Sequence, residues 1–302
     1  MRRLDLEDPP GRPYGRGVTG ADPKPPIASA LWLPIFDALA DPRLVAGLAA
    51  EAEEAGWHGL FVWDHLRWRS PVVDVADPWI TLTAIAAATE QLRFGPMVTP
   101  LARRRPAKVA KEAATLDRFS GGRLTLGVGL GSDRFGQELS GTGEELDDRV
   151  RAQALDESLA ILTAAWSGEP VTFHGVHHRI DAVAFRPRPV QEPGIPIWVA
   201  TFPGSTRPRR RAARHDGVFP VNLTHPEQLR EITEDIARHR RDAGIEVGTP
   251  FDVAVELPVG TDVEPWIAAG ATWWFAGFDP AATSIDEVRG VLRDGPATST
   301  RR

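Results

Sequence analysis

The sequence contains no cysteine among its 302 residues. This absence excludes a disulfide scaffold, a zinc site built on thiolates and a cysteine nucleophile. A chain without cysteine also fits a reducing compartment, so we expect a cytoplasmic protein.

Long apolar runs are missing as well. No stretch approaches the roughly 20 apolar residues of a membrane-spanning helix, and the N-terminus lacks the basic-then-apolar order of a signal peptide. The 35 Lys and Arg residues against 41 Asp and Glu residues give a formal net charge of -6, which provides no general attraction to nucleic acid or anionic lipid. We therefore expect no membrane and no nucleic-acid partner. Separately, we expect the chain to form a homodimer.

Hydrophobic residues make up 42% of the chain, enough for a large core. Residues 1–27 differ, because they are rich in Pro, Gly and charge and show no hydrophobic period. We expect them to form a flexible N-terminal tail, and residues 28–302 to form a single domain.

Apolar segments of strand length alternate with helical segments after this tail. Asp41 and Pro42, for example, are a helix cap and a first helical residue, and Gly56 ends that helix. The sequence predicts strands near residues 28–36, 59–63, 93–98, 124–129, 195–200, 216–220, 251–257 and 272–278. It predicts helices near residues 42–55, 77–90, 106–119, 144–167, 205–214, 226–243, from 262, and 284–293, with an inserted hairpin at 171–183.

This alternation indicates an α/β fold with a parallel sheet covered on one outer face. Eight such units in about 270 residues suit a closed (β/α)8 TIM barrel with insertion segments, and an open doubly wound sheet is the alternative. The loops that follow barrel strands carry the chemistry in barrel enzymes, so we expect the functional residues to lie there.

Asp64 and His65 follow the second predicted strand. An imidazole titrates near neutral pH, and a neighbouring carboxylate can fix its tautomer or accept a proton. On local sequence alone, a turn-capping Asp64 with His65 packed beside Trp68 is an equally good interpretation. Their place at the mouth of a barrel favours a catalytic pair.

Three further loops could receive an anionic or flat ligand. After the third strand come Thr99 and the arginines at 103–105, and for any individual arginine a solvated basic turn is the better interpretation. After the fourth come Gly129 and Gly131, whose missing side chains let a ring or phosphate approach the backbone. After the fifth, residues 201–206 precede a helix and offer backbone N–H groups and hydroxyls to a phosphate. The arginines at 207–211 are best explained as a solvated helix face.

Three histidines gather in the predicted hairpin, at positions 174, 177 and 178. We expect no metal site there, because a metal-dependent barrel hydrolase needs ligands from several strand ends. Trp273 and Trp274 are neighbours in one strand, and we expect them to pack on opposite faces of the barrel wall.

Several longer motifs resemble the luciferase-like monooxygenase superfamily. They are GWHGLFVWDH at 56–65, ATLDRFSGGRLTLGVGLG at 114–131, and the later IPIWVA and ARHDGVFP. The resemblance covers about residues 28–293 and implies the same barrel fold. Members bind FMN or the deazaflavin coenzyme F420, with the ring in the barrel mouth and the phosphate near the loop after the fifth strand.

The resemblance assigns catalysis to His65 and Asp64. It assigns cofactor binding to Asp64, Thr99, Gly129, Gly131, Gly204 and Ser205. Because Asp-His commonly closes the second strand of the F420 branch, it implies an F420-dependent oxidoreductase that moves a hydride to or from a small organic substrate. An FMNH2-dependent monooxygenase is the alternative, and a non-catalytic flavin-binding protein is an alternative of another class. Leu130 stands where sugar-phosphate dehydrogenases of this branch carry an acid, so that substrate does not follow.

Overall fold

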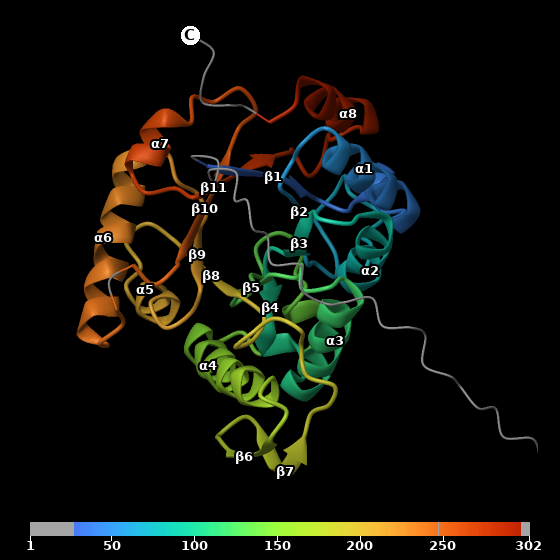
Figure 1. Cartoon of the computed structure of the whole chain (residues 1–302). Coiled ribbons are helices and arrows are strands. Elements are labelled where there is room, and N and C mark those ends of the chain that lie inside the picture. The colour runs from blue at the N-terminus through green and yellow to red at the C-terminus, as the bar shows by residue number, and fades with distance from the viewer. Residues whose placement is uncertain (1–26, 247, 297–302) are drawn as a thin grey trace, which may run out of the picture.

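A computed structural model describes residues 27–246 and 248–296 of the chain (Figure 1). Its strands are β1 (Ala28–Leu33), β2 (Gly59–Val62), β3 (Arg93–Pro96), β4 (Thr99–Pro100), β5 (Leu126–Gly129), β6 (Pro170–His174), β7 (Arg179–Ala184), β8 (Ile197–Thr201), β9 (Gly217–Pro220), β10 (Asp252–Leu257) and β11 (Trp273–Gly277). Its helices are α1 (Pro42–Glu54), α2 (Pro78–Ala88), α3 (Pro106–Phe119), α4 (Asp148–Ala165), α5 (Arg207–Ala212), α6 (Pro226–Asp242), α7 (Glu264–Ala268) and α8 (Ile285–Asp294). The alternation predicted from the sequence is confirmed.

Nine of these strands form one parallel sheet, in the order β3-β2-β1-β11-β10-β9-β8-β5-β4. The two ends of that order meet, because β3 and β4 are successive halves of one barrel strand, joined through Met97 and Val98, whose peptide bond is cis. A bridge between Phe94 and Leu124 adds a second link across the seam. The structure is therefore a (β/α)8 barrel, and the open doubly wound sheet is wrong.

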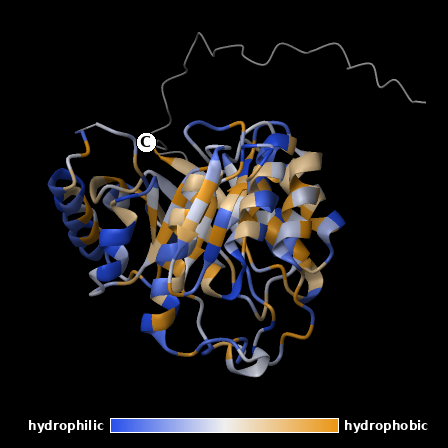
Figure 2. Ribbon diagram, turned by 90° about the horizontal axis from the view of Figure 1, so that it is seen from below, coloured by the Kyte–Doolittle hydropathy of each residue, from blue (hydrophilic) through white to orange (hydrophobic). Residues whose placement is uncertain are grey.

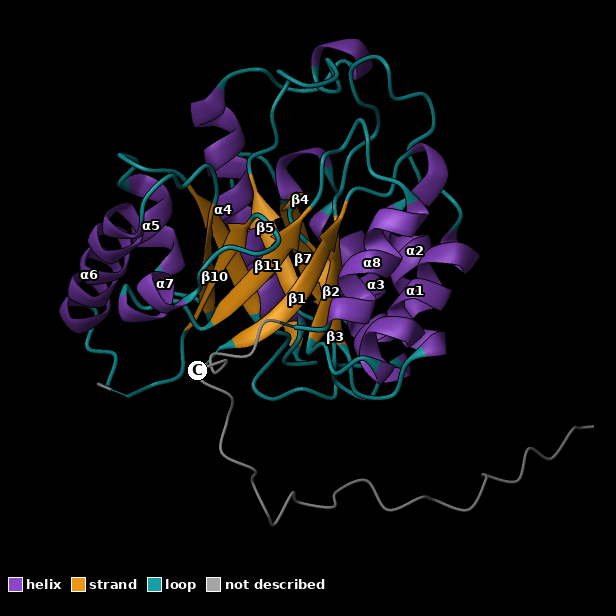
Figure 3. Cartoon of the chain, turned by 90° about the horizontal axis from the view of Figure 1, so that it is seen from above, coloured by secondary structure: helices purple, strands orange, loops and turns teal. Residues whose placement is uncertain are grey.

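Helices surround the barrel, as Figures 1 and 3 show from two directions. Helix starts follow the sequence closely: Asp41 accepts a hydrogen bond from the backbone N–H of Arg43, and Pro42 begins α1. Asp77 and Pro78 repeat this arrangement at α2, where the Asp77 side chain accepts the N–H of Ile80. These caps set where each helix returns along the outside of the barrel.

Side chains alternate between the barrel interior and the layer beneath the helices. Trp273 belongs to an interior cluster with Phe61 and Trp198, whereas Trp274 packs against Trp57 in the outer core, as predicted. Figure 2 shows apolar residues concentrated along the strands and polar residues on the outer helices. The side chains of this interior cluster fill the barrel between its strands. A ligand would therefore bind at the barrel mouth, where the loops after the strands lie.

Two insertions extend from the barrel. One is the irregular segment between β5 and α4, and the other is the hairpin of β6 and β7, which lies beside α4 (Figure 1). The predicted tail falls outside the described residues except for Ile27, which is buried in the outer core. Among the described helices, none is long and apolar enough to cross a membrane.

Candidate active site

Asp64 lies just beyond β2 and is 2% exposed. Its carboxylate accepts a hydrogen bond from Thr99 Oγ1 at 2.7 Å. Arg103 Nη2 donates to Oδ1 at 2.8 Å, and Arg104 Nη2 lies 2.9 Å from both oxygens. Both carboxylate oxygens thus accept two hydrogen bonds each, and these contacts anchor the loop after β2 to the loop after β4.

Glu138 comes from the inserted segment after β5 and completes the arrangement. Its Oε1 lies 2.9 Å from Nδ1 of His65, and its Oε2 accepts the backbone N–H of Leu66 at 2.8 Å. Arg103 Nη1 lies 2.7 Å from Oε2 of Glu138 and forms an ion pair with it. The geometry of this pair is not that of a hydrogen bond. Sequence reasoning missed Glu138, because nothing in its irregular surroundings points to a residue 73 positions earlier.

Glu138 remains ionised in these surroundings. Burial opposes its ionisation, but the hydrogen bond and charge of His65, followed by the charge of Arg103 and the Leu66 N–H, outweigh burial and hold the pKa of Glu138 below its usual range. The carboxylate is therefore a fixed negative charge that orients the imidazole.

The His65 ring stands among aromatic side chains at the barrel mouth. It packs edge-on against Trp68, with ring centroids 4.7 Å apart, and contacts Phe36 and Trp63 at 6.1 and 5.8 Å. Its side chain is 20% exposed. Since Nδ1 is engaged by Glu138 and no residue in the described ranges bonds Nε2, the second nitrogen is free to meet a ligand.

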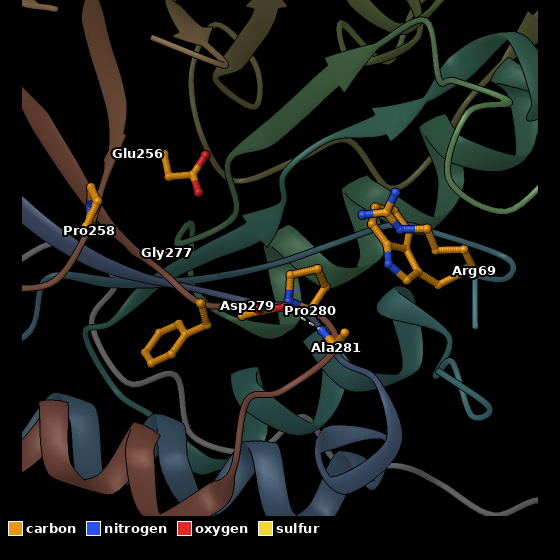
Figure 4. A pocket seen from close by; sticks show the side chains of 9 residues that line it. Arg69, Glu256, Pro258, Gly277, Asp279, Pro280 and Ala281 are labelled. Atoms are coloured by element: carbon orange, nitrogen blue, oxygen red, sulfur yellow. Dashed lines mark hydrogen bonds between the residues drawn. The ribbon is translucent and has the colours of Figure 1, made fainter. Parts of the chain in front are cut away.

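A cavity of about 420 Å³ opens beside this aromatic group. Its walls come from the loop after β2 and the carboxyl ends of β10 and β11, and its lining residues are Trp68, Arg69, Glu256, Pro258, Gly277, Phe278, Asp279, Pro280 and Ala281. Figure 4 shows Glu256 on one side and Arg69 on the other. Trp68 links the two features, because it lines the cavity and packs against His65.

Glu256 is the largely buried acid of this cavity. Burial raises its pKa from 4.5 to about 7, because a carboxylate there loses most of its hydration. The sequence carries a signal for this position: in β10, Ala254 faces the barrel interior, and Glu256, two residues later, lies on the same side of the strand at the barrel mouth.

At three positions predicted to bind a cofactor, contacts within the protein already account for the type of residue present. The hydroxyl of Thr99 is buried against Asp64. A Cβ on Gly129 would lie 2.8 Å from Cγ2 of Val98, and one on Gly131 would lie 2.9 Å from Cβ of Pro100. Close packing between neighbouring loops thus requires glycine at both positions, and their contact with a cofactor stays a prediction.

Gly204 and Ser205 form the turn after β8. Ser205 Oγ donates to the carbonyl of Phe202 at 2.7 Å and accepts its N–H at 3.2 Å, which closes the turn. Gly204 has φ +75°, and nothing lies within 4 Å of the position its Cβ would take. An exposed turn with an open glycine has room for a phosphate, so this prediction also stays open.

The arginines after β4 have a different role from the predicted one. Arg103 and Arg104 are paired with Asp64 and Glu138, so two of the three cations are not available to an anionic ligand. In the arginine stretch of α5, Arg209 is likewise buried and pairs with Glu231 at 2.8 Å, which corrects the expectation of a solvated face there.

The hairpin histidines are engaged in structural contacts. Glu157 accepts the backbone N–H groups of residues 176–178, and His178 contacts the hydroxyl of Ser158 at 3.2 Å. Across residues 27–246 and 248–296, no group of three or more His, Asp and Glu side chains is arranged to hold a metal ion.

The sequence profile of the family described as luciferase-like monooxygenase matches residues 22–269. The chain belongs to this family. The motif at 56–65, which ends in Asp64 and His65, and the block at 114–131 lie within the matched range. The resemblance drawn from the sequence is confirmed.

Named relatives in this luciferase-like family include an F420-dependent glucose-6-phosphate dehydrogenase of Nakamurella multipartita. It is 35% identical over 231 residues, which cover 74% of this chain and 65% of the relative. The chain thus spans slightly less than two thirds of that relative's length.

Solved structures share the family's fold. The coenzyme F420-dependent tetrahydromethanopterin reductase of Methanopyrus kandleri superimposes with a TM-score of 0.73 at 18% identity, covering 89% of this chain and 98% of the reductase. The monooxygenase RslO1 of Streptomyces bottropensis has a TM-score of 0.65 at 26% identity, covering 77% of this chain and 71% of RslO1. The barrel is therefore that of the luciferase-like proteins.

Proposed function

We propose that this protein is an F420-dependent oxidoreductase that transfers a hydride between the deazaflavin and a small organic substrate at the barrel mouth. The observation that carries the proposal is the imidazole of His65, held through Nδ1 by Glu138 and bordered by Trp68 of an open cavity. Family membership and the F420-dependent relative of Nakamurella multipartita support the choice of cofactor.

The residues at the mouth fit a cofactor of this kind. The turn of Gly204 and Ser205 leaves open space where a phosphate can approach, and the mouth holds a cavity bordered by aromatic side chains. In the proposal, this turn holds the phosphate, and the loops of Thr99, Gly129 and Gly131 form a wall beside the ring. The bound deazaflavin supplies a carbon that accepts or releases a hydride.

The protein's own residues would orient the reactants and handle the proton. His65 Nε2 exchanges a proton with the substrate or donates a hydrogen bond to it, while Glu138 fixes the ring. Asp64 was predicted as a catalytic partner, but its four donor contacts support a positioning role, in which it anchors the loop that carries His65.

An FMNH2-dependent monooxygenase is the second candidate, favoured by the similarity to RslO1. Deazaflavin reacts poorly with oxygen, so the identity of the bound cofactor separates the two functions. A non-catalytic flavin-binding protein would use the same phosphate turn but would not need His65.

A titration of the purified full-length protein with F420 and FMN in parallel, read by cofactor fluorescence, tests the proposal. We expect F420 to bind at least ten times more tightly than FMN. Tighter binding of FMN would favour the monooxygenase, and binding of neither cofactor would remove the proposed function altogether.

A homodimer and a cytoplasmic location are also part of the proposal. Sedimentation equilibrium across a range of protein concentrations tests the dimer. Fractionation of the producing cells tests the location.

A further inference from the structure

Glu256 is a carboxyl group without a protein partner at the edge of the proposed site. No hydrogen bond or ion pair joins its side chain to any residue in the described parts of the chain, although the side chain is largely buried. The neighbouring strand makes room for it, because a Cβ on Gly277 would lie 2.6 Å from Oε1 of Glu256. Because Glu256 lines an open cavity, its carboxyl group can take a hydrogen-bond partner from outside the protein, either water or a bound ligand.

The charges around the cavity restrict what that partner can be. Arg69, the lining residue with a positive charge, is exposed and lies with its guanidinium over the ring of Phe135 at 5.6 Å. Asp279, the second acid, accepts the N–H of Ala281 at 2.9 Å and so shapes its own turn. The buried cations Arg103 and Arg104 are paired with Asp64 and Glu138. The cavity therefore offers an anion no buried positive charge.

We propose that Glu256 determines the substrate class of this site by accepting a hydrogen bond from a hydroxyl or ammonium group next to the reacting carbon, and that it excludes anionic substrates. This inference rests on the proposed function. It separates this protein from its sugar-phosphate-oxidising relative, because a phosphate in the cavity would face the carboxyl groups of Glu256 and Asp279, with the exposed Arg69 as the cation among the lining residues.

The assignment is compatible with the atom balance of the proposed reaction. Oxidation of a CH–OH group to a carbonyl removes one hydride and one proton: the hydride would pass to the oxidised deazaflavin of the proposed function, and the O–H proton would pass to Nε2 of His65. The Glu256 carboxylate would accept the hydrogen bond of the neighbouring hydroxyl or ammonium group. Reduction of the carbonyl would return the hydride and the proton.

Three probes built on the same cyclohexyl ring test the charge preference without any cofactor: cyclohexanol, cyclohexylamine and cyclohexanecarboxylate. Their binding to the full-length protein is measured at pH 8 by ligand-observed NMR. For the wild type we expect the amine and the alcohol to bind at least ten times more tightly than the carboxylate. Equal affinities for all three probes would overturn the inference.

Glu256→Gln removes the charge and preserves the shape. We expect it to weaken binding of the amine and to strengthen binding of the carboxylate, each by about tenfold, with little change for the alcohol. Glu54→Gln is the matched control, since Glu54 is an exposed residue of α1 with no contact to the cavity. Should Glu256→Gln fail to fold, Glu256→Met tests the same loss of charge.

The outcomes separate the two proposals. A reversed charge preference in Glu256→Gln supports the inference even where neither F420 nor FMN binds, which would overturn only the proposed function. Tight F420 binding together with unchanged probe affinities in Glu256→Gln overturns the inference alone.

Discussion

Nδ1 of His65 lies 2.9 Å from Oε1 of Glu138, and this contact joins two loops that are 73 residues apart in the sequence. The second oxygen of Glu138 accepts the N–H of Leu66, so one carboxylate fixes both the ring and the backbone beside it. The orientation of the proposed proton-handling group therefore depends on the inserted segment after β5.

Glu138→Gln should cost stability and catalysis together. The substitution removes one of the two carboxylates that pair with Arg103, and Asp64 is the one that remains. Breaking a buried ion pair of this kind costs about 3 kcal/mol of unfolding free energy. We expect kcat to fall by roughly tenfold or more with KM little changed, because the ring loses its fixed orientation. Urea denaturation and steady-state kinetics measure the two effects.

A purely structural role for Glu138 would leave the pH profile of kcat unchanged, whereas we expect the profile to change in Glu138→Gln. Glu157→Gln is a suitable comparison, because Glu157 also accepts backbone N–H groups, but in the β6–β7 turn. That variant should lose stability and keep the pH profile of the wild type.

His65→Ala should leave cofactor affinity within a few-fold and lower turnover by about 100-fold or more, the usual effect of losing an acid or base. Cofactor fluorescence titration and single-turnover kinetics separate the two quantities. Unchanged turnover would remove His65 from the mechanism, and if no substrate turned over with the wild type either, the non-catalytic alternative would gain support.

Gly204→Asp should weaken cofactor binding, because it places a negative charge beside the proposed phosphate position. The open space around Gly204 means that the side chain itself meets no obstacle. Gly204→Asn has the same shape, and Asn, like Asp, tolerates positive φ, so it isolates the charge. We expect Asp to weaken F420 binding by about tenfold relative to Asn. Equal affinities would place the phosphate elsewhere.

The sequence predicted the barrel well because its signals are local. Caps such as Asp41 with Pro42 fix helix starts, and alternation in β11 places Trp273 and Trp274 on opposite faces. The positions of Asp64 and His65 followed from strand order alone. These features can be predicted without knowing which residues distant in the sequence contact one another.

The partners of those residues could not be predicted in the same way. Glu138 lies in an irregular segment without a periodic pattern, so only the folded chain shows that it reaches His65. Arg103 and Arg104 looked like ligand-binding cations because their buried acidic partners are separated from them in the sequence. By contrast, the sequence does single out Glu256, since an acidic residue at the last inward-facing position of an apolar strand is unusual.

The raised pKa of Glu256 predicts a specific pH dependence of stability. Its pKa is about 7 in the folded protein against 4.5 in the unfolded chain. Between these values the folded state binds more protons at this site, so the Glu256 contribution to the unfolding free energy falls as pH rises through the window. Above pH 7 the ionised carboxyl costs up to about 3 kcal/mol.

Glu256→Gln removes this cost, so its unfolding free energy relative to the wild type should rise between pH 5 and pH 8, by up to about 3 kcal/mol. Urea denaturation at the two pH values measures the difference. Glu54→Gln, which makes the same chemical change at an exposed position, should show almost no such rise. A flat difference for Glu256→Gln would mean that the carboxyl is well hydrated in solution, and the selective role proposed for it would lose its physical basis.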